Sequence, residues 1–162
     1  MNGSEAAPTS ELVIRTSRRF SCPATKVWPL LCDSRIEGRA RLLFHLGVPQ
    51  PLQCRLPEGR GEVGVERECV SDRGIVRQRI LDWRPEERLS FRMEETSLPI
   101  RAFVREMVDT IVLVPSGSSL QVTRTTTVRV SGRYRILRKW LLRIGIKQVH
   151  RYVFRSWLRL VS

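Results

Sequence analysis

The last third of the sequence contains no acidic residue. From Thr110 to Ser162 there are 11 of the 29 basic residues and none of the 16 acidic ones, so most of the formal charge of +13 lies in this part of the chain. Such an asymmetry predicts an anionic partner, for example a membrane surface, a nucleic acid or an acidic protein. An arginine-rich genome is the alternative explanation for the many arginines, but it does not account for the missing carboxylates.

Cysteine and histidine are scarce and widely spaced. The histidines are His45 and His150, and the four cysteines form no CxxC pair: Cys22, Cys32, Cys54 and Cys69. This spacing matches no zinc motif, and the sequence implies no metal and no cofactor. A disulfide framework is not expected in a domain of this size without a signal peptide, so we predict reduced thiols.

Long apolar runs are also missing. No stretch approaches the ~20 apolar residues of a membrane-spanning helix. The polar start MNGSEAAPTSE lacks the apolar segment of a signal peptide. The sequence therefore predicts a cytoplasmic protein. With 162 residues, 41% of them hydrophobic, we expect one domain over residues 11–162 after a disordered tail over 1–10.

Hydrophobic periodicity predicts the elements of this domain. ELVIRTSRRF alternates like a strand, and SCPATKVWPLLCDS and RIEGRARLLFHLG indicate two short helices, the first kinked or shortened by Pro29. A period of two then predicts strands over 51–56, 61–71, 74–83, 87–95, 103–114 and 119–130. The segment 133–161 predicts one long amphipathic helix. Short links favour antiparallel neighbours, so we expect an α+β fold in which a curved antiparallel sheet of about seven strands wraps around the last helix.

Two segments resemble a known family. CPATKVWPLLCDS is similar to the entry segment of the START-like, or SRPBCC, superfamily. GRGEVGVERECVSDRGIVRQRILDWRPEERLSFRM resembles its sheet, with a Trp-x-Pro turn (Trp83, Pro85) before a Leu-x-Phe strand. The resemblance covers about Leu12 to Leu160 and implies a helix-grip fold with a cavity between the sheet and the long helix. Members bind lipids, sterols, polyketides or plant metabolites, and some are polyketide cyclases, aromatases or dehydratases. The family has no common catalytic motif, so no catalytic residue is carried over.

The stretch GRGEVG matches the dinucleotide-binding pattern GxGxxG. A dinucleotide site needs this pattern to follow a strand and to open a helix, whose N–H groups receive the phosphates. Here it is followed by VERECV, which has the pattern of a strand. We therefore predict a turn that enters a strand.

Two arginines are candidates for contact with a ligand. Arg67 and Arg124 alternate with apolar strand residues and point into the cavity if both strands keep their register. There they could bind a carboxylate or phosphate of an otherwise apolar ligand. The alternative is a bulge that turns them outward, or a salt bridge to one of three acidic residues: Glu62, Glu66 or Glu106.

Further candidates lie on the predicted strands and the last helix. His150, on the apolar face of the helix, is either a general acid or base or a buried histidine with one hydrogen bond. Large apolar residues would line a cavity if there is one and fill the core otherwise: Phe91, Met93, Phe154 and Trp157.

A basic ridge follows the last helix, with a cation at every fourth position: Arg143, Lys147, Arg151, Arg155 and Arg159. Residues four apart share a helix face, and like charges there repel one another. The ridge suits contact with an anionic membrane surface, which would make the protein peripheral at the membrane. Nucleic acid is a less favoured partner, because no aromatic strand motif of the RNP type is present. A solvated face is the remaining alternative.

Taken together, these patterns favour the binding, transport or presentation of an apolar small molecule, lipid or polyketide-like. One alternative is a cyclase or dehydratase of the same fold, although the lack of a catalytic motif favours a role other than catalysis. Another is a basic adaptor that docks on anionic membranes or nucleic acid. Convergence of His150, Arg67 and Arg124 would favour the enzyme, and an apolar lining would favour the carrier.

Overall fold

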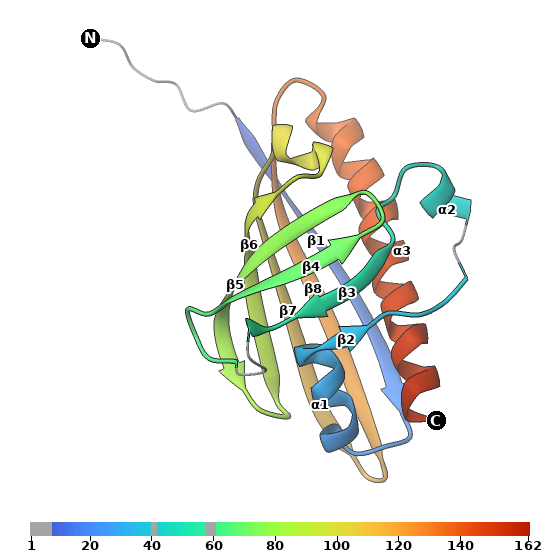
Figure 1. Ribbon diagram of the computed structural model, residues 1–162. Helices are drawn as coiled ribbons and strands as arrows, with labels where there is room; N and C mark the ends of the chain where they lie inside the picture. The colour runs from blue at the N-terminus through green and yellow to red at the C-terminus, as the bar shows by residue number, and fades with distance from the viewer. Residues whose placement is uncertain (1–7, 40–41, 58–60) are drawn as a thin grey trace.

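An antiparallel sheet curls around one long helix in the computed structural model, which describes residues 8–39, 42–57 and 61–162 (Figure 1). Within these residues, eight strands follow one another in the order β1-β8-β7-β6-β5-β4-β3-β2. They are β1 (Thr9–Phe20), β2 (Ser34–Arg35), β3 (Pro51–Arg55), β4 (Glu66–Ser71), β5 (Gly74–Arg84), β6 (Arg88–Thr96), β7 (Val104–Ser116) and β8 (Ser119–Ser131). Links of two or three residues join the pairs β4–β5, β5–β6 and β7–β8.

The long helix α3 (Arg135–Val161) lies across the concave side of the sheet and contacts β1 and β8 (Figure 1). The helix α1 (Ala24–Cys32) packs against the C-terminal half of α3, while α2 (Leu42–His45) and the 3₁₀ helix η2 (Pro99–Ala102) lie nearer its N-terminal half. Pro29 lies inside α1, which ends at Cys32. This is the helix-grip arrangement that the resemblance implied, and the predicted α+β class is confirmed.

Most predicted strands agree with the observed ones within two residues, because turn-forming residues interrupt the period of two. Three places differ. β1 begins at Thr9, so the end of the predicted tail belongs to the sheet, and residues 1–7 lie outside the described part. Residues 61–65 form a turn ahead of β4. The second predicted helix is reduced to α2, with the two-residue strand β2 before it.

The described part of the GRGEVG segment, residues 61–64, leads into a strand and not a helix, as predicted, while Gly59 and Arg60 lie outside the described residues. Gly64 has a φ of 92°, which favours glycine. A Cβ atom on Gly61 would lie 2.0 Å from the ring of Trp83. The glycine therefore allows the chain to approach an indole closely, a packing role that needs no nucleotide.

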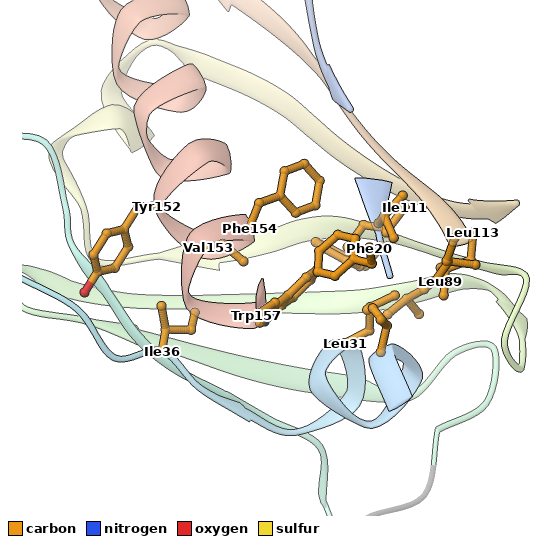
Figure 2. Packing of buried hydrophobic residues seen from close by; sticks show 14 of the residues in the cluster. Phe20, Leu31, Ile36, Leu89, Ile111, Leu113, Tyr152, Val153, Phe154 and Trp157 are labelled. Atoms are coloured by element: carbon orange, nitrogen blue, oxygen red, sulfur yellow. The ribbon is translucent and has the colours of Figure 1, made fainter. Parts of the chain in front are cut away.

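The main core lies where α1, α3 and the sheet meet. Figure 2 shows Phe20, Leu31, Phe154 and Trp157 packed together there, with Phe154 fully buried. The ring of Phe154 meets those of Phe20 and Trp157 edge to face at centroid distances of 6.2 and 5.8 Å. This cluster fills the space between sheet and helix at the C-terminal end of α3.

A disulfide joins Cys54 and Cys69, which are direct partners on β3 and β4. The prediction of reduced thiols is therefore wrong for this pair, while Cys22 and Cys32 remain free. The antiparallel register places the two Cα atoms 4.1 Å apart across a separation of 15 residues. Spacing along the sequence does not reveal such a pairing, because it depends on which strands become neighbours.

We expect reduction of this disulfide to lower the free energy of unfolding by about 3 kcal/mol, the value for a closed loop of this length. Urea titrations with and without a phosphine reductant measure the difference. Cys54→Ser should unfold at the reduced midpoint under both conditions, whereas Cys22→Ser should keep the response to reductant. Equal midpoints for the oxidised and reduced wild type would contradict the expectation.

Candidate functional site

A cavity of about 940 Å³ lies between the curled sheet and α3. Its wall is mostly apolar and includes Ile111, Val149, Val153 and Trp157. Six polar side chains form one group in this wall: Arg67, Gln78, Asp109, Arg124, Thr126 and His150. Further polar residues of the lining are Ser71, Tyr134 and Arg138. The volume is in the range of sites for small organic molecules, and the mixture of an apolar wall with a few polar groups is typical of them.

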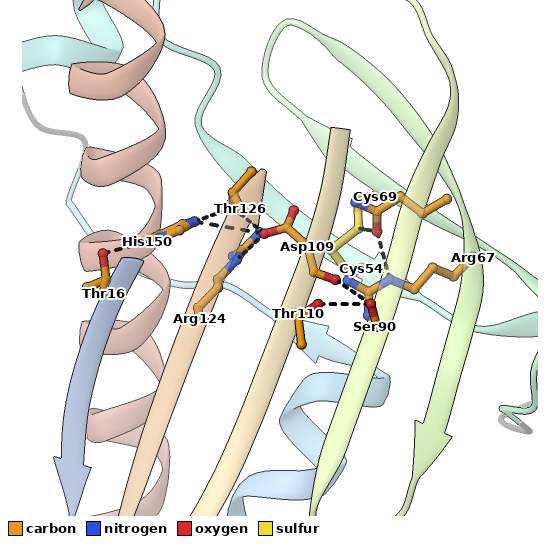
Figure 3. A network of polar contacts seen from close by, with 11 residues as sticks. Thr16, Cys54, Arg67, Cys69, Ser90, Asp109, Thr110, Arg124, Thr126 and His150 are labelled. Carbon is orange, nitrogen blue, oxygen red and sulfur yellow. Dashed lines mark hydrogen bonds and ion pairs between the residues drawn. A yellow bond between two sulfur atoms is a disulfide. The ribbon is translucent and has the colours of Figure 1, made fainter. Parts of the chain in front are cut away.

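Asp109 on β7 is the centre of the polar group (Figure 3). Its neighbours on β8 bind the same carboxylate oxygen: Arg124 Nε donates to Oδ1 at 2.9 Å, and the Thr126 hydroxyl also donates to Oδ1. Asp109 and Thr126 are direct partners in the β7–β8 ladder. The register of these two strands therefore builds the cluster. The other carboxylate oxygen, Oδ2, has no hydrogen-bond partner among the described side chains.

His150 on α3 continues this network toward β1. Its Nε2 lies 2.7 Å from Thr126 Oγ1, and its Nδ1 lies 3.1 Å from Thr16 Oγ1. Because the Thr126 hydroxyl donates to Asp109, it accepts from His150 Nε2–H. The other ring nitrogen then accepts from the Thr16 hydroxyl. The network thus fixes one neutral tautomer and uses both ring nitrogens.

The charges in this network follow from burial and from the neighbouring groups. Burial, and next the cation of Arg124, lower the pKa of His150 to about 3, so the ring is neutral at physiological pH. Burial alone would raise the pKa of Asp109, but Arg124 outweighs it and the pKa lies below its usual value. His150 Nε2 and Asp109 Oδ1 lie 3.9 Å apart, so a neutral ring is in contact with an ionised carboxylate.

Arg67 on β4 is the second cation of the cavity. Its Nε donates to Gln78 Oε1 and its Nη1 donates to the carbonyl of Leu31, both at 2.8 Å. The guanidinium lies 3.9 Å from the centre of the Phe91 ring. Burial, and then the charge of Arg124, lower the pKa of Arg67 to about 10, so it remains protonated at neutral pH.

The inner part of the cavity consequently has an excess of positive charge. Arg67 and Arg124 are both cations, Asp109 is the single carboxylate among the described lining residues, and His150 is neutral. The two terminal nitrogens of Arg124 have no hydrogen-bond partner in the described part of the chain. A buried unbalanced cation is unfavourable, so this arrangement suits a ligand that carries one negative charge.

The structure brings together five of the seven residues that the sequence predicted for ligand contact. They are Arg67, Met93, Arg124, His150 and Trp157, all in the cavity wall. Phe91 and Phe154 differ from the prediction, because they lie in the packed core and not in the lining.

Alternation along the strands correctly predicted that both arginines face the cavity. The acidic residues predicted as their salt-bridge partners were not the right ones. Arg124 pairs with Asp109, whereas Glu66 and Glu106 bind other surface arginines. The sequence prediction missed Asp109, as well as Gln78, Thr126 and Thr16. Asp109 does have a signal in the sequence, since it alternates in phase with the buried residues Ile111 and Leu113.

The basic ridge lies along the outer side of α3. Four of its five members are exposed: Arg143, Lys147, Arg151 and Arg159. Arg155 is half-buried, and its Nη1 has no hydrogen-bond partner. None of the five forms an ion pair with a described acidic residue.

Metal binding, thiol catalysis and a membrane-spanning helix find little support in the described part of the chain. No three side chains of His, Cys, Asp or Glu gather there as metal ligands would. Burial raises the pKa of the free Cys32 thiol to about 11, so it is protonated and a weak nucleophile at neutral pH. None of the described helices is both long and apolar enough to cross a bilayer.

Similar structures support the fold. The Zhui aromatase/cyclase from Streptomyces sp. R1128 has a TM-score of 0.67 at 14% identity, covering 93% of each chain. Ginseng major latex-like protein 151 from Panax ginseng has a TM-score of 0.64 at 15% identity, covering 95% of this chain and 98% of that one. Protein MLL2253 from Mesorhizobium loti has a TM-score of 0.63 at 18% identity, covering 92% and 96%. Among curated proteins nothing matches this chain.

A match between this sequence and a protein-family model shows the family. The model described as polyketide cyclase / dehydrase and lipid transport matches residues 11–161, nearly the whole chain. The helix-grip fold agrees with this match, and the expected START-like resemblance is confirmed. The chain belongs to the polyketide cyclase / dehydrase and lipid transport family.

Proposed function

We propose that this protein binds an apolar small molecule with a single anionic group, held in the cavity between the sheet and α3. The observation that carries the proposal is the excess positive charge inside a largely apolar cavity. The apolar wall would take the body of the ligand, as in other small-molecule sites. Arg124, with two terminal nitrogens unpaired among the described residues, would receive a carboxylate or a similar anion in a charge-assisted hydrogen bond.

The polar network supports binding more than proton transfer. His150 is fully buried, and both of its ring nitrogens already have partners. A general acid or base must reach the proton that it moves, and its pKa should lie near the working pH. The pKa of about 3 for His150 fits neither requirement. In this proposal His150 positions Thr126, which in turn positions Asp109 and Arg124.

A matched pair of ligands tests the proposal: a long-chain carboxylic acid and its methyl ester, in competition with a fluorescent apolar probe. We expect the acid to bind at least about tenfold more tightly, because only the acid neutralises the excess cation. Arg67→Gln and Arg124→Gln should each remove most of this preference. Arg124→Lys, which keeps a cation beside Asp109, should retain it.

Arg129→Gln is the matched control, since Arg129 lies on the same strand but pairs with Glu106 at the surface. It should bind both ligands like the wild type. Equal affinity of the wild type for acid and ester would contradict the anionic group. Failure of either ligand to displace the probe, together with a native mass spectrum free of bound apolar molecules, would contradict the proposal as a whole.

Cyclase or dehydratase chemistry is a second candidate, because Arg67, Arg124 and the His150 network do meet in one cavity. One structural neighbour is named an aromatase/cyclase. In that case the two arginines would stabilise an oxyanion that forms on a polyketide substrate. Cyclised product from a linear poly-β-keto thioester, detected by mass spectrometry and lost in Arg124→Gln, would favour it. No product from the wild type would leave binding as the function.

A further inference from the structure

The outer side of α3 changes from apolar to basic along the helix. In its N-terminal half, large apolar side chains face solvent, with Ile136 81%, Trp140 59% and Leu141 54% exposed. In the C-terminal half, the same side carries Lys147 and Arg151. The amphipathic pattern of this helix predicts that its apolar face packs against the sheet. That holds for the C-terminal half, but the first turns of α3 present apolar residues on the outside as well.

Exposed apolar residues of this half also line the cavity, so the cavity opens to solvent beside them. Leu137, Trp140 and Leu141 on α3 all contribute to the cavity wall, and so does Leu46, which follows α2 and is 71% exposed. We call Leu46, Ile136, Leu137, Trp140 and Leu141 the mouth patch. Figure 1 shows α2 beside the N-terminal half of α3.

The packing of the fold explains why the mouth patch is uncovered. Val48, in the segment between α2 and β3, reaches α3 at Gly145, where an added Cβ would lie 3.6 Å from it. Beyond this point toward the N-terminus of α3, the main core ends, and Leu142 joins a smaller cluster that faces the sheet. The outer side of the first two turns of α3 therefore has no covering element among the described residues.

Charge around the mouth patch selects the partner. Arg133 and Arg143 are exposed at its two ends, Arg135 is half-buried beside it, and no acidic residue follows Asp109 in the sequence. A second copy of the chain on this patch would bring these cations close together, which is unfavourable. An anionic bilayer instead attracts the cations and accepts the apolar side chains, and tryptophan is favoured at the membrane interface.

We propose that the mouth patch docks on the surface of an anionic membrane, with Trp140 and Leu141 inserted at the interface and the flanking arginines on the lipid headgroups. The cavity opening then faces the bilayer. An apolar molecule can pass between bilayer and cavity without crossing water. Docking depends on the mouth patch and its flanking arginines, so it does not require that the proposed ligand be correct.

Trp140 provides the first measurement. Among the four tryptophans, Trp157 is buried, Trp28 and Trp83 are half-buried, and only Trp140 is exposed. We expect vesicles of phosphatidylcholine with phosphatidylglycerol to shift the emission to the blue and to protect it from acrylamide. Vesicles of phosphatidylcholine alone should give a smaller response, and added salt should weaken binding to the anionic ones. Trp140→Phe should lose the spectral shift while still sedimenting with anionic vesicles.

A pair of leucine variants tests the position of the contact. Leu141→Ser removes an apolar side chain from the mouth patch, and we expect combination with Trp140→Ser to lower vesicle partitioning at least about tenfold. Leu160→Ser is the matched control, because Leu160 lies on the same helix with 50% exposure but at the far end. It should partition like the wild type. Circular dichroism should be unchanged in these variants. The wild type should bind anionic vesicles whether or not it prefers the carboxylic acid to its methyl ester, which separates this test from that of the proposed function.

The proposal would be overturned if the wild type did not bind anionic vesicles, or if Leu160→Ser lost as much vesicle partitioning as the mouth-patch variant. It would also be overturned if binding depended on Arg151 and Arg159 and not on the mouth patch. A dimer in analytical ultracentrifugation that Leu141→Ser dissociates would show that a second copy covers the patch. Retention on an acidic protein without any vesicle binding would assign the patch to a protein partner.

Discussion

Asp109→Ala is expected to lower the free energy of unfolding by about 3–5 kcal/mol, the range for breaking a buried ion pair by removing one partner. The variant leaves Arg124 and Arg67 as two neighbouring cations without a carboxylate, and it removes the acceptor of the Thr126 hydroxyl. Asp109→Asn should cost less than Asp109→Ala, because the amide oxygen still accepts from Thr126. Urea denaturation followed by circular dichroism gives the comparison.

Asp82→Ala is a suitable control, since Asp82 also lies near two arginines, Arg84 and Arg88, but at the surface. Surface ion pairs contribute about 0–1 kcal/mol, so a small loss is expected. A double variant with Arg124→Leu should lose less than the sum of the single changes, because it removes the orphaned charge. A loss below about 1 kcal/mol for Asp109→Ala would mean that water in the cavity replaces the carboxylate.

The strands could be predicted closely because local chemistry decides them. Alternation of apolar residues sets the period, and turn residues such as those between Ser71 and Gly74 set the ends. The same reasoning extended β4 backward over residues 61–65, where Gly61 and Gly64 instead form a turn against Trp83. That turn depends on a tertiary contact with the next strand, which the local pattern does not contain.

The sequence predicted the side chains of the candidate site that depend on one strand alone, but not the contacts that depend on pairing between strands. The alternation of apolar residues along each strand was sufficient to predict that Arg67 and Arg124 face the cavity. Their real partners depend on neighbouring strands: Asp109 faces Arg124 only because β7 and β8 pair in one particular register. The Cys54–Cys69 bond is a further case, since it follows from the β3–β4 register. Pairing between strands is global information, and a slip of one residue would reverse every side chain.

The division between cavity and core was not predictable from residue type. Trp157 and Phe154 lie three residues apart on α3 and pack in the same core cluster, yet Trp157 also lines the cavity and Phe154 does not. Both are large apolar residues on the apolar side of one helix. What separates them is how each side chain is directed between α1, α3 and the sheet, which depends on the tertiary packing. Composition does not encode such an arrangement.

Stability should fall steeply when the pH is lowered from neutral, chiefly because of His150. Its pKa is about 3 in the folded chain, against an ordinary value of 6.5. Between these values the unfolded chain binds a proton that the folded chain does not, so stability is complete above pH 6.5 and declines toward pH 3. At about 1.4 kcal/mol per pH unit, the expected loss is about 3 kcal/mol near pH 4.5 and about 4 near pH 3. Asp109, whose pKa is lowered, adds to this loss only below its ordinary value of 3.8.

Histidine variants isolate this contribution. His150→Gln removes the titrating ring, so its stability should change much less than that of the wild type between neutral pH and about pH 4.5. His45→Gln should reproduce the wild-type profile, because His45 is exposed. In NMR spectra of the folded wild type, the His150 ring should remain neutral between pH 6.5 and about pH 4.5. Parallel pH profiles for the wild type and His150→Gln would contradict a neutral, buried His150, and would assign the loss to carboxylates instead.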